Sequence, residues 1–569
     1  MLKSLLESSS SDNGKARCFA VENTVELTNL IPPTVSYNST GHLVVIGPIS
    51  ILKDLAPQLT EMATVTFLCT DNQLALSGSD LSRVDAVDNA EPLDRLYFSK
   101  RIHVTGFLGT FQVSVEVNGV MENLAQVAIG KDRFDLVLDM TLTSHMSEEV
   151  PVPGYYPVGR GYPKLAEALT EIPTLMGTFD KPKFFRLDTD KCAHSSRGVK
   201  GCDRCVDACP AGALTSDGND EIGHKIQINP YLCQGVGTCA TACPTEAISY
   251  ALPEPEQTQK FIENLLANYK KAGGMNPIIL FCSERHESYN VMALKALPDN
   301  VIPVELEDLP SVGIDTWFAA LTNGACQVMF AASLHMPETI KRVLGQEVEV
   351  AKQLLTQLGL EPNRIDILFL ESMRNGLPEL IERPLALLLG PLEGNKRQRL
   401  FTALDNLAQI YTPKQLETQV SASAPFGKVS CDETSCTLCM GCVAVCPTAA
   451  LHNDGSSPKL QFIEQDCIQC GMCEKACPEN ALTLSSQFNW DHETRQTPQV
   501  IHEEKAAECL SCGKPFAPQS MITMLQDKLR GHSHFANETA LSRIAMCEDC
   551  RVIDMFSTLA DNPEKQLDI

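Results

Sequence analysis

Cysteines in short clusters are the residues of this sequence best suited to chemistry. Two runs, CTLCMGCVAVC (436–446) and CIQCGMCEKAC (467–477), share the spacing Cys-x2-Cys-x2-Cys-x3-Cys, and a proline follows each run. Three thiolates at that spacing wrap around one face of an iron–sulfur cube, and the Cys-Pro of the other run closes the fourth corner. The proline fixes the turn that ends each run. The spacing therefore predicts two [4Fe–4S] clusters that exchange one ligand each.

This exchange defines two ligand sets, which we name site D and site C. Site D takes Cys436, Cys439, Cys442 and Cys477, and site C takes Cys446, Cys467, Cys470 and Cys473. Zinc is disfavoured at both, because paired Cys-Pro motifs add nothing to a zinc site. Cys431, a ninth cysteine nearby, is interpreted as a bystander.

A related but irregular block lies about 230 residues earlier, in GCDRCVDACPAGAL (201–214) and LCQGVGTCATACPTEAI (232–248). The first position of its first motif falls at Val199, which cannot ligate iron, and the nearest upstream cysteine is Cys192. A loop insertion costs little, so Cys192 can still return to the cluster. We name the resulting [4Fe–4S] set site B: Cys192, Cys202, Cys205 and Cys243. His194 is the competing ligand.

Three cysteines remain in this block and form site A: Cys209, Cys233 and Cys239. The position of the fourth motif cysteine holds Val236, which has no lone pair for a metal. Three thiolates suit a [3Fe–4S] cluster, but an incompletely ligated [4Fe–4S] cluster with a non-motif ligand and an empty site both stay open. Gly235 and Gly237 flank the valine and let the backbone follow a cluster closely, which argues against simple decay of the motif.

The C-terminal region carries two further pairs, in CLSCGKPF (509–516) and MCEDCR (546–551). Two Cys-x2-Cys pairs suit a tetrahedral structural zinc site, which we name the tail site. Its ligands are Cys509, Cys512, Cys547 and Cys550. His532 and His534 are alternative ligands, and a further iron–sulfur cluster or free thiols are the other interpretations. A metal would fold a segment too small to fold alone.

The elements that position these cysteines follow from hydrophobic periodicity. Short apolar runs predict strands at 42–47, 64–69 and 134–140, with a hairpin or meander over 101–119. Later runs predict strands at 277–283, 301–306, 326–332 and 364–370, with helices over 312–323 and 337–358 between them. Alternating strands and helices indicate parallel sheets covered by helices. Cys282, at a predicted strand end beside Arg285 and His286, is interpreted as a packing residue rather than a reactive one.

The predicted fold class is α/β plus α+β, in five domains. Two α/β (Rossmann-like) units each precede a two-cluster ferredoxin domain of bacterial type, and a zinc-type tail follows. The predicted boundaries are 1–180 for the first α/β domain, 181–253 for ferredoxin-like domain 1, 254–425 for the second α/β domain, 426–486 for ferredoxin-like domain 2 and 487–569 for the tail. No dinucleotide or P-loop fingerprint is present in the sequence.

Composition limits the partners. The 569 residues carry a formal charge of -25, which disfavours nucleic acid and favours basic patches on other proteins. The N-terminal residues lack the apolar segment of a signal peptide, and no apolar run is long enough to span a membrane. We therefore expect a cytoplasmic protein with no transmembrane segment, whose 24 cysteines are reduced and serve mainly as ligands.

Several stretches resemble a family of large proteobacterial 4Fe–4S binding proteins. They are KPKFFRLDTDKCAHSSRGVKGCDRCVDACPAGAL (181–214), YLCQGVGTCATACPTEA (231–247), FDLVLDM (134–140), VPVPGYYPVGRG (150–161) and PVELEDLPSVGIDTWFAAL (303–321). The similarity covers most of the chain. Genes of that family are often associated with formate dehydrogenase and its accessory factors, so the resemblance implies formate dehydrogenase as a redox partner. The family pattern has a cysteine where this sequence has Val236.

These observations predict an electron-transfer protein that relays single electrons through four clusters, to or from a dehydrogenase. No base, nucleophile or substrate pocket stands out, so catalysis by this chain alone is not predicted. One alternative is a cofactor-binding subunit of an oxidoreductase, whose α/β units bind flavin or a substrate. Another is an accessory factor that hands clusters or electrons to a maturing dehydrogenase.

Overall fold

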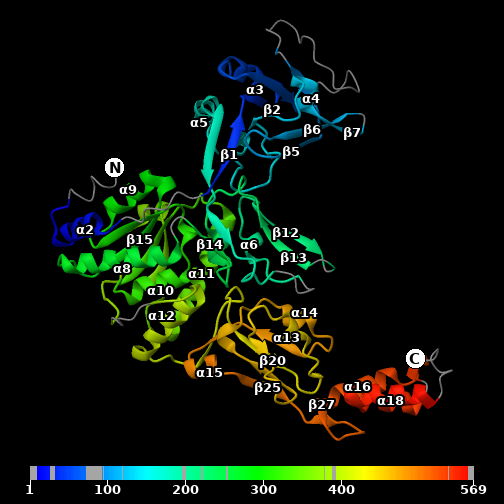
Figure 1. Ribbon diagram of the computed structural model, residues 1–569. Helices are drawn as coiled ribbons and strands as arrows, with labels where there is room; N and C mark the ends of the chain where they lie inside the picture. The colour runs from blue at the N-terminus through cyan, green and yellow to red at the C-terminus, as the bar shows by residue number, and fades with distance from the viewer. Residues whose placement is uncertain are drawn as a thin grey trace.

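The first α/β unit is built on a five-stranded sheet (Figure 1). The structure is a computed structural model that describes residues 9–25, 33–71, 93, 95–117, 119–194, 200–219, 221, 223–251, 254–376, 378–386, 392–535 and 537–561. The sheet has the order β4-β3-β2-β8-β9, and all its pairs are parallel. Its strands are β2 (His42–Gly47), β3 (Thr64–Cys69), β4 (Leu96–Phe98), β8 (Leu136–Asp139) and β9 (Tyr155–Tyr156). The strands predicted at 42–47, 64–69 and 134–140 are confirmed.

Each face of this sheet is covered by a different layer. An antiparallel meander, as predicted for 101–119, packs on one face with α4 (Leu124–Ile129), and its described residues are 101–117 and 119–123. Its strands are β5 (Ile102–Thr105), β6 (Gln112–Val117) and β7 (Val120–Asn123). Helices α3 (Ile49–Leu55) and α5 (Leu165–Glu171) cover the other face. Both faces are therefore buried, which explains the continuous apolar runs of the central strands.

The carboxyl edge of β2 and β8 is the switch point of this sheet, where open α/β sheets bind ligands. A Cβ atom added to Gly159 would lie 2.3 Å from the main-chain oxygen of Thr141, and one added to Gly47 would lie 2.9 Å from Cβ of Met140. The turn η3 (Val158–Arg160) thus packs directly on the backbone that follows β8. Main chain, rather than open space, lies at this point of the edge.

The second α/β unit has a four-stranded parallel sheet of order β16-β15-β17-β18. Its strands are β15 (Ile278–Ser283), β16 (Val301–Leu306), β17 (Gln327–Ala332) and β18 (Ile365–Phe369), and its helices are α8 (Pro255–Lys271), α9 (Glu287–Ala296), α10 (Ile314–Thr322), α11 (Glu338–Gln357) and α12 (Lys396–Ile410). All four predicted strands and both predicted helices are confirmed. Trp317 and Phe330 are completely buried in the core of this unit.

The N-terminal helix α2 (Asp12–Asn23) packs on the second α/β unit and not on the first (Figure 1). Ala16 and Ala20 lie in the same core as Ile262 of α8. Arg17 donates a 3.0 Å hydrogen bond to the main-chain oxygen of Val301 and pairs with Asp299 at 2.9 Å. Residues at the start of the chain therefore complete the core of a unit that begins about 250 positions later.

Two cysteine-rich units repeat one design. In each, an antiparallel strand pair closes the unit, a hairpin lies between the motifs, and two short helices carry cysteines. The first unit has β11 (Phe185–Leu187), β14 (Ile248–Tyr250), β12 (Leu214–Asn219), β13 (Gly223–Ile228), α6 (Arg204–Asp207) and α7 (Thr238–Ala242). The second has β20 (Lys428–Cys431), β23 (Leu482–Ser485), β21 (Leu451–His452), β22 (Lys459–Phe462), α13 (Gly441–Val445) and α14 (Met472–Ala476). The duplication visible in the sequence is thus also a duplication of structure.

Short strand pairs and a small tail complete the chain. One pair joins β1 (Thr34–Ser39) to β10 (Gly177–Pro182), and another joins β19 (Glu417–Gln419) to β24 (Gln487–Asn489). A third joins β25 (Gln499–Glu503) to β22. Helix α15 (His492–Gln496) precedes β25. The tail holds β26 (Ala506–Glu508), β27 (Pro515–Pro518), α16 (Gln519–Leu529), α17 (Glu538–Ser542) and α18 (Glu548–Asp561), and it projects at the lower right of Figure 1. No helix among the described residues is long and apolar enough to cross a bilayer.

Candidate metal centres

The cysteines of sites C and D line two separate cavities in the second cysteine-rich unit. Cys436, Cys439, Cys442 and Cys477 surround one cavity, and Cys446, Cys467, Cys470 and Cys473 surround the other. The fourth cysteine of each set comes from the other motif, because α13 and α14 pack side by side. These are the groups that the spacing brings together.

Backbone conformation directs amide groups at these sulfurs. Leu438 and Gln469 directly precede the second cysteine of each motif, and they have positive φ of 49° and 53°. The Leu438 amide donates to Sγ of Cys436 at 3.5 Å, and the Ala481 amide donates to Sγ of Cys477 at 3.3 Å. Hydrogen bonds to sulfur favour the thiolate, which is the form that binds iron.

Burial and the neighbouring cysteines oppose ionisation of one thiol at each of these two sites, Cys442 and Cys473. Burial, with the charges of Cys436, Cys439 and Cys477, raises the pKa of Cys442 to about 12. Burial, with the charges of Cys467, Cys470 and Cys446, does the same to Cys473. Bound iron ions would remove this penalty, because their positive charge compensates the thiolates. The donor sets therefore fit iron–sulfur clusters.

Site B groups its four predicted cysteines in the first cysteine-rich unit. Burial raises the pKa of Cys205, and the charges of Cys243, Cys202 and Cys192 raise it further. Cys192 thus lies with the motif cysteines despite its distance in sequence. Val199 and the rest of 195–199 lie outside the described residues.

His194 is already engaged at both ring nitrogens. The side chain is fully buried, its Nδ1 lies 2.9 Å from the main-chain oxygen of Cys202, and its Nε2 lies 2.8 Å from Oγ of Ser216. Because a carbonyl oxygen only accepts, Nδ1 carries the proton and Nε2 accepts from the serine hydroxyl. His194 therefore stabilises the backbone at Cys202. Because both its ring nitrogens are hydrogen-bonded, the structure does not favour His194 as an iron ligand.

Site A presents three cysteines and no fourth donor of a usual kind. Cys209, Cys233 and Cys239 line one cavity together with Val236, which is 5% exposed. The other lining residues are Phe185, Pro210, Ala211, Ala213, Leu214, Ile228, Gln234, Gly235, Gly237 and Thr238. Within the described wall of this cavity there is no further cysteine, histidine or carboxylate.

The glycines beside Val236 are required by close packing. Gly237 has φ of +95°, and a Cβ there would lie 2.5 Å from Cα of Ser311 in the second α/β unit. Gly235 has φ of +73°, and its Cβ would lie 2.7 Å from the Phe184 ring. Thr241 also donates to the main-chain oxygen of Pro310 at 2.6 Å. The Val236 loop is therefore held firmly between its own unit and the second α/β unit.

Two cations lie against the backbone of site A. Nζ of Lys181 donates to the main-chain oxygens of Cys233 and Tyr231, at 2.7 and 3.0 Å. Burial lowers the pKa of Lys181 to about 8. Arg285, at the carboxyl end of β15, hydrogen-bonds the main-chain oxygen of Gln234 and pairs with Glu307 at 3.1 Å. Neither cation could be assigned to site A from the sequence, because both lie far from it along the chain.

The candidate sites A and B share the core of the first cysteine-rich unit. Cys239 of site A and Cys205 and Cys243 of site B belong to one cluster of buried residues. Burial raises the pKa of Cys239, and that of Cys202 of site B to about 11. Site B also meets the second unit, because Gly201, next to Cys202, packs on Met472, next to Cys473 of site C.

The contact between the two cysteine-rich units lies at this B–C junction. A Cβ added to Gly201 would lie 3.0 Å from Sδ of Met472, which is completely buried. Nζ of Lys475 donates to the main-chain oxygen of Lys200 at 3.4 Å. Gly201 precedes Cys202 of site B, and Met472 precedes Cys473 of site C. The packing of the two units therefore sets the distance between these sites.

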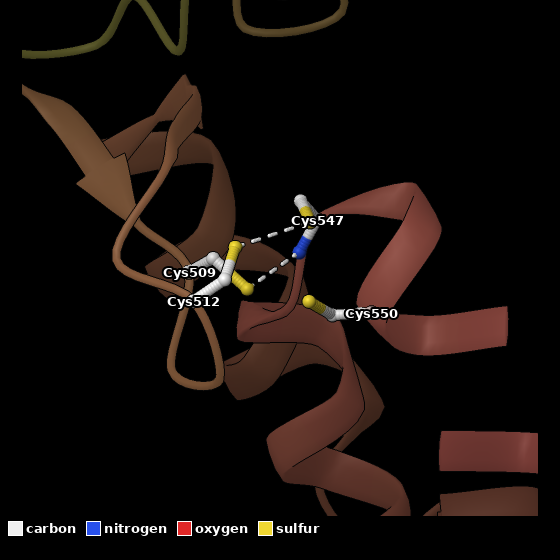
Figure 2. Close-up of side chains that lie close together, drawn as sticks. All are labelled: Cys509, Cys512, Cys547 and Cys550. Carbon is white, nitrogen blue, oxygen red and sulfur yellow. Dashed lines mark hydrogen bonds between the residues drawn. The ribbon is translucent and has the colours of Figure 1, made fainter. Parts of the chain in front are cut away.

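The four tail cysteines converge on one point (Figure 2). Their sulfur atoms all lie within 4.8 Å of one another, and Sγ of Cys512 and Cys547 are 3.8 Å apart. A tetrahedral ion with Zn–S bonds of about 2.3 Å sets its sulfurs about 3.8 Å apart, whereas an iron–sulfur cube spreads them further. Among the described residues this is the one group of three or more such ligands packed so closely. Its geometry fits a single metal ion.

Amide groups also prepare the tail site for a cation. Although burial opposes it, the N–H groups of Cys547, Cys512 and Ser511 hold the pKa of Cys509 below its usual range. His532 and His534 stack on each other instead of joining the quartet. The four cysteines of the Cys-x2-Cys pairs, and neither histidine, form this close group.

The cysteines outside these sites are mainly packing residues. Cys69, Cys282 and Cys326 are completely buried. Burial raises the pKa of all three thiols, so none is an activated nucleophile. Cys431 does not line the cavity of site D, but a hydrogen bond with Cys436 raises its pKa. Its interpretation as a bystander stays a prediction.

Comparison with known protein families agrees with this geometry. Residues 200–247 match a family described as a 4Fe-4S dicluster domain. Residues 433–449 and 460–483 each match a 4Fe-4S binding domain. The chain is a multi-cluster iron–sulfur protein with ferredoxin-type domains. No curated protein matches it significantly.

Proposed function

We propose that this protein relays single electrons along sites A, B, C and D in that order. The observation that carries the proposal is the B–C junction, where Gly201, next to Cys202 of site B, meets Met472, next to Cys473 of site C. Without this junction the two cysteine-rich units would be independent pairs of clusters. With it, an electron that enters one unit can reach the other without leaving the chain. Iron–sulfur clusters supply one-electron chemistry of this kind.

The proposed cofactors follow from the donor sets. Sites B, C and D each offer four cysteines and hold [4Fe–4S] clusters. Site A offers three cysteines and a buried valine, which supports a [3Fe–4S] cluster over a cube with a protein ligand. The tail site holds a structural zinc ion. The domain boundaries predicted from the sequence are also part of the proposal, except that α2 belongs with the second α/β unit, where it packs.

The two ends of the row differ in exposure, which supports an exit at site D. Cys439 of site D is exposed, whereas the other seven cysteines of sites C and D are buried or partly buried. Site A instead lies against the second α/β unit through Gly237 and Arg285. A partner protein can approach site D directly, and the acidity of the chain favours a partner with a basic surface.

The resemblance to proteins associated with formate dehydrogenase supplies the proposed donor. In this scheme formate dehydrogenase passes electrons one at a time to the relay, and a second redox protein accepts them. The chain itself performs no bond-making step. A cytoplasmic location is part of this proposal, since cysteines that serve as metal ligands need a compartment that keeps thiols reduced.

The first test is spectroscopic. Anaerobically purified protein is oxidised and then reduced stepwise, and electron paramagnetic resonance is recorded while iron and zinc are counted on the same sample. We expect a three-iron signal in the oxidised state, with about 15 irons and about one zinc per chain. About 16 irons without a three-iron signal would show that an outside ligand completes site A.

The relay itself is tested by removing its middle. The variant Cys470→Ser damages site C, and formate with formate dehydrogenase is added as the electron source. We expect reduction to stop on one side of site C, whereas the intact protein reduces fully. If the clusters on both sides still reduce at the original rate, the sites do not act in sequence. If formate dehydrogenase reduces nothing in the intact protein but dithionite does, the partner is wrong and the relay stands.

A further inference from the structure

Three cations in the first turn of α12 connect the second α/β unit to both cysteine-rich units. They are Lys396, Arg397 and Arg399, with Gln398 between the last two. Asn395 caps the helix by accepting from the Gln398 amide at 3.0 Å, and Oε1 of Gln398 accepts from the Asn395 amide at 3.0 Å. This capping box fixes the first turn, so its three cationic side chains leave the helix in fixed directions.

Two of the cations hold the first cysteine-rich unit. Nζ of Lys396 donates to the main-chain oxygens of Ala240 and Thr241, which lie between Cys239 of site A and Cys243 of site B. Its amide donates to Glu246 at 3.0 Å. Arg399, 1% exposed, pairs with Glu246 at 2.7 Å and with Asp315 at 3.0 Å. The charge of Arg399 is therefore neutralised by two carboxylates.

Arg397 holds the second cysteine-rich unit, and it does so without a carboxylate partner. Its Nη2, Nε and Nη1 donate to the main-chain oxygens of Cys467, Gln465 and Pro425, at 2.6, 2.5 and 2.5 Å. The guanidinium also lies 4.6 Å from the centre of the Phe401 ring. Within the described part of the chain, Arg397 forms no ion pair, whereas the neighbouring Arg495 is paired with Asp405 at 2.6 Å.

Arg397 bonds to main-chain oxygens and has no carboxylate within ion-pair distance among the described residues. The acidic groups that act on it from further away are Asp466 and Glu464. The residue that accepts its 2.6 Å bond, Cys467, is itself a cysteine of site C. An unpaired cation thus lies within one hydrogen bond of the backbone of one iron–sulfur site.

We propose that the first turn of α12 is an electrostatic bridge that sets the reduction potential of site C through Arg397 and fixes the separation of the two cysteine-rich units. This inference rests on the proposed relay. Reduction adds one negative charge to a cluster, and a cation fixed nearby stabilises that charge. Arg397 therefore raises the potential of site C and favours its reduction.

Arg397 acts on site C through its charge, and this effect is measured as the reduction potential of site C. Arg397→Gln removes the charge and keeps a hydrogen-bond donor, and Arg397→Lys keeps the charge but loses the planar fork. In redox titrations followed by electron paramagnetic resonance, we expect site C to shift to a lower potential in R397Q and by a smaller amount in R397K. Arg383→Gln, which removes an 80% exposed cation paired with Glu361, is the matched control and leaves all potentials unchanged.

A second variant tests whether the bridge is specific for each unit. Lys396→Gln removes the cation that faces Ala240 and Thr241. We therefore expect a lower reduction potential in the first cysteine-rich unit and an unchanged reduction potential at site C. An unchanged site C potential in R397Q, with the iron count intact, would overturn the inference while the relay remained. Loss of electron passage in the unaltered protein would instead overturn the relay. Equal shifts at every site in R397Q would show a general structural change and would also overturn the inference.

Discussion

The main-chain N–H of Cys547 donates a 3.2 Å hydrogen bond to Sγ of Cys509, which lies 38 positions earlier in the chain. This contact joins the two Cys-x2-Cys pairs of the tail and leaves their four sulfurs at the spacing of one tetrahedral ion. The tail around them has a small core, in which three buried apolar residues, Ala507, Ile522 and Ile544, are packed with a few partly buried ones. A metal ion is therefore expected to supply much of its stability.

Loss of one tail cysteine should release the metal and unfold the tail alone. For Cys512→Ser we expect about one zinc fewer per chain, an unchanged iron count, and faster cleavage after β25 in limited proteolysis. Leu510→Ala changes a 65% exposed residue of the same loop and is the control that keeps its zinc. Zinc retained in C512S, or irons lost with the zinc, would contradict a separate tail site.

A cysteine in place of Val236 should complete site A. For Val236→Cys we expect the three-iron signal of the oxidised protein to disappear and the iron count to rise by about one. Val445→Cys places a cysteine at a similarly buried position beside a site that already has four, and it should change neither quantity. A three-iron signal that persists in V236C would mean that the valine is not what keeps the fourth iron out.

His194 and Cys192 should respond differently to substitution. For His194→Gln we expect all clusters to remain, with a lower temperature of cluster loss, because the bonds to Cys202 and Ser216 are weakened. For Cys192→Ser we expect loss of the site B signal. Iron counting and electron paramagnetic resonance on both variants decide the matter, and loss of site B in H194Q with retention in C192S would reverse the assignment.

Arg399 should be among the most destabilising positions of the second α/β unit. Arg399→Met leaves Asp315, which is almost fully buried, without its cation, and the free energy of unfolding should fall by about 3–5 kcal/mol. Urea unfolding followed by the fluorescence of buried Trp317 measures this change. Lys341→Met removes a surface pair with Glu338, 82% exposed, and should cost less than about 1 kcal/mol. Equal effects of the two variants would argue against a structural role for the buried pair.

Much of the fold could be read from local patterns. Strands such as β15 and β17 are uninterrupted apolar runs, because helices cover both faces of a parallel sheet. Helix α11 follows from its amphipathic periodicity over 20 residues. The packing of α2 on the second α/β unit could not be predicted in this way. Its partners lie about 250 positions away, and nothing in the local pattern of α2 identifies them.

The site was predictable where its geometry is local. Cys436, Cys439 and Cys442 reach one cavity because their spacing and a left-handed turn at Leu438 bring them there. His194 had two readings in the sequence, and only its contacts with Cys202 and Ser216 distinguish a brace from a ligand. The residues KRQR at 396–399 include three cations, but the sequence pattern does not show which units their side chains contact.

By itself, the sequence predicted which cysteines share each site, because motif spacing acts over a few residues of chain. It also placed Val236 at a position where the motif expects a cysteine. Only the tertiary structure decided that site B faces site C across Gly201 and Met472, and that Arg397 reaches the backbone of Cys467. Those relationships depend on how separate units pack, and packing is set by surfaces assembled from distant segments rather than by any local pattern.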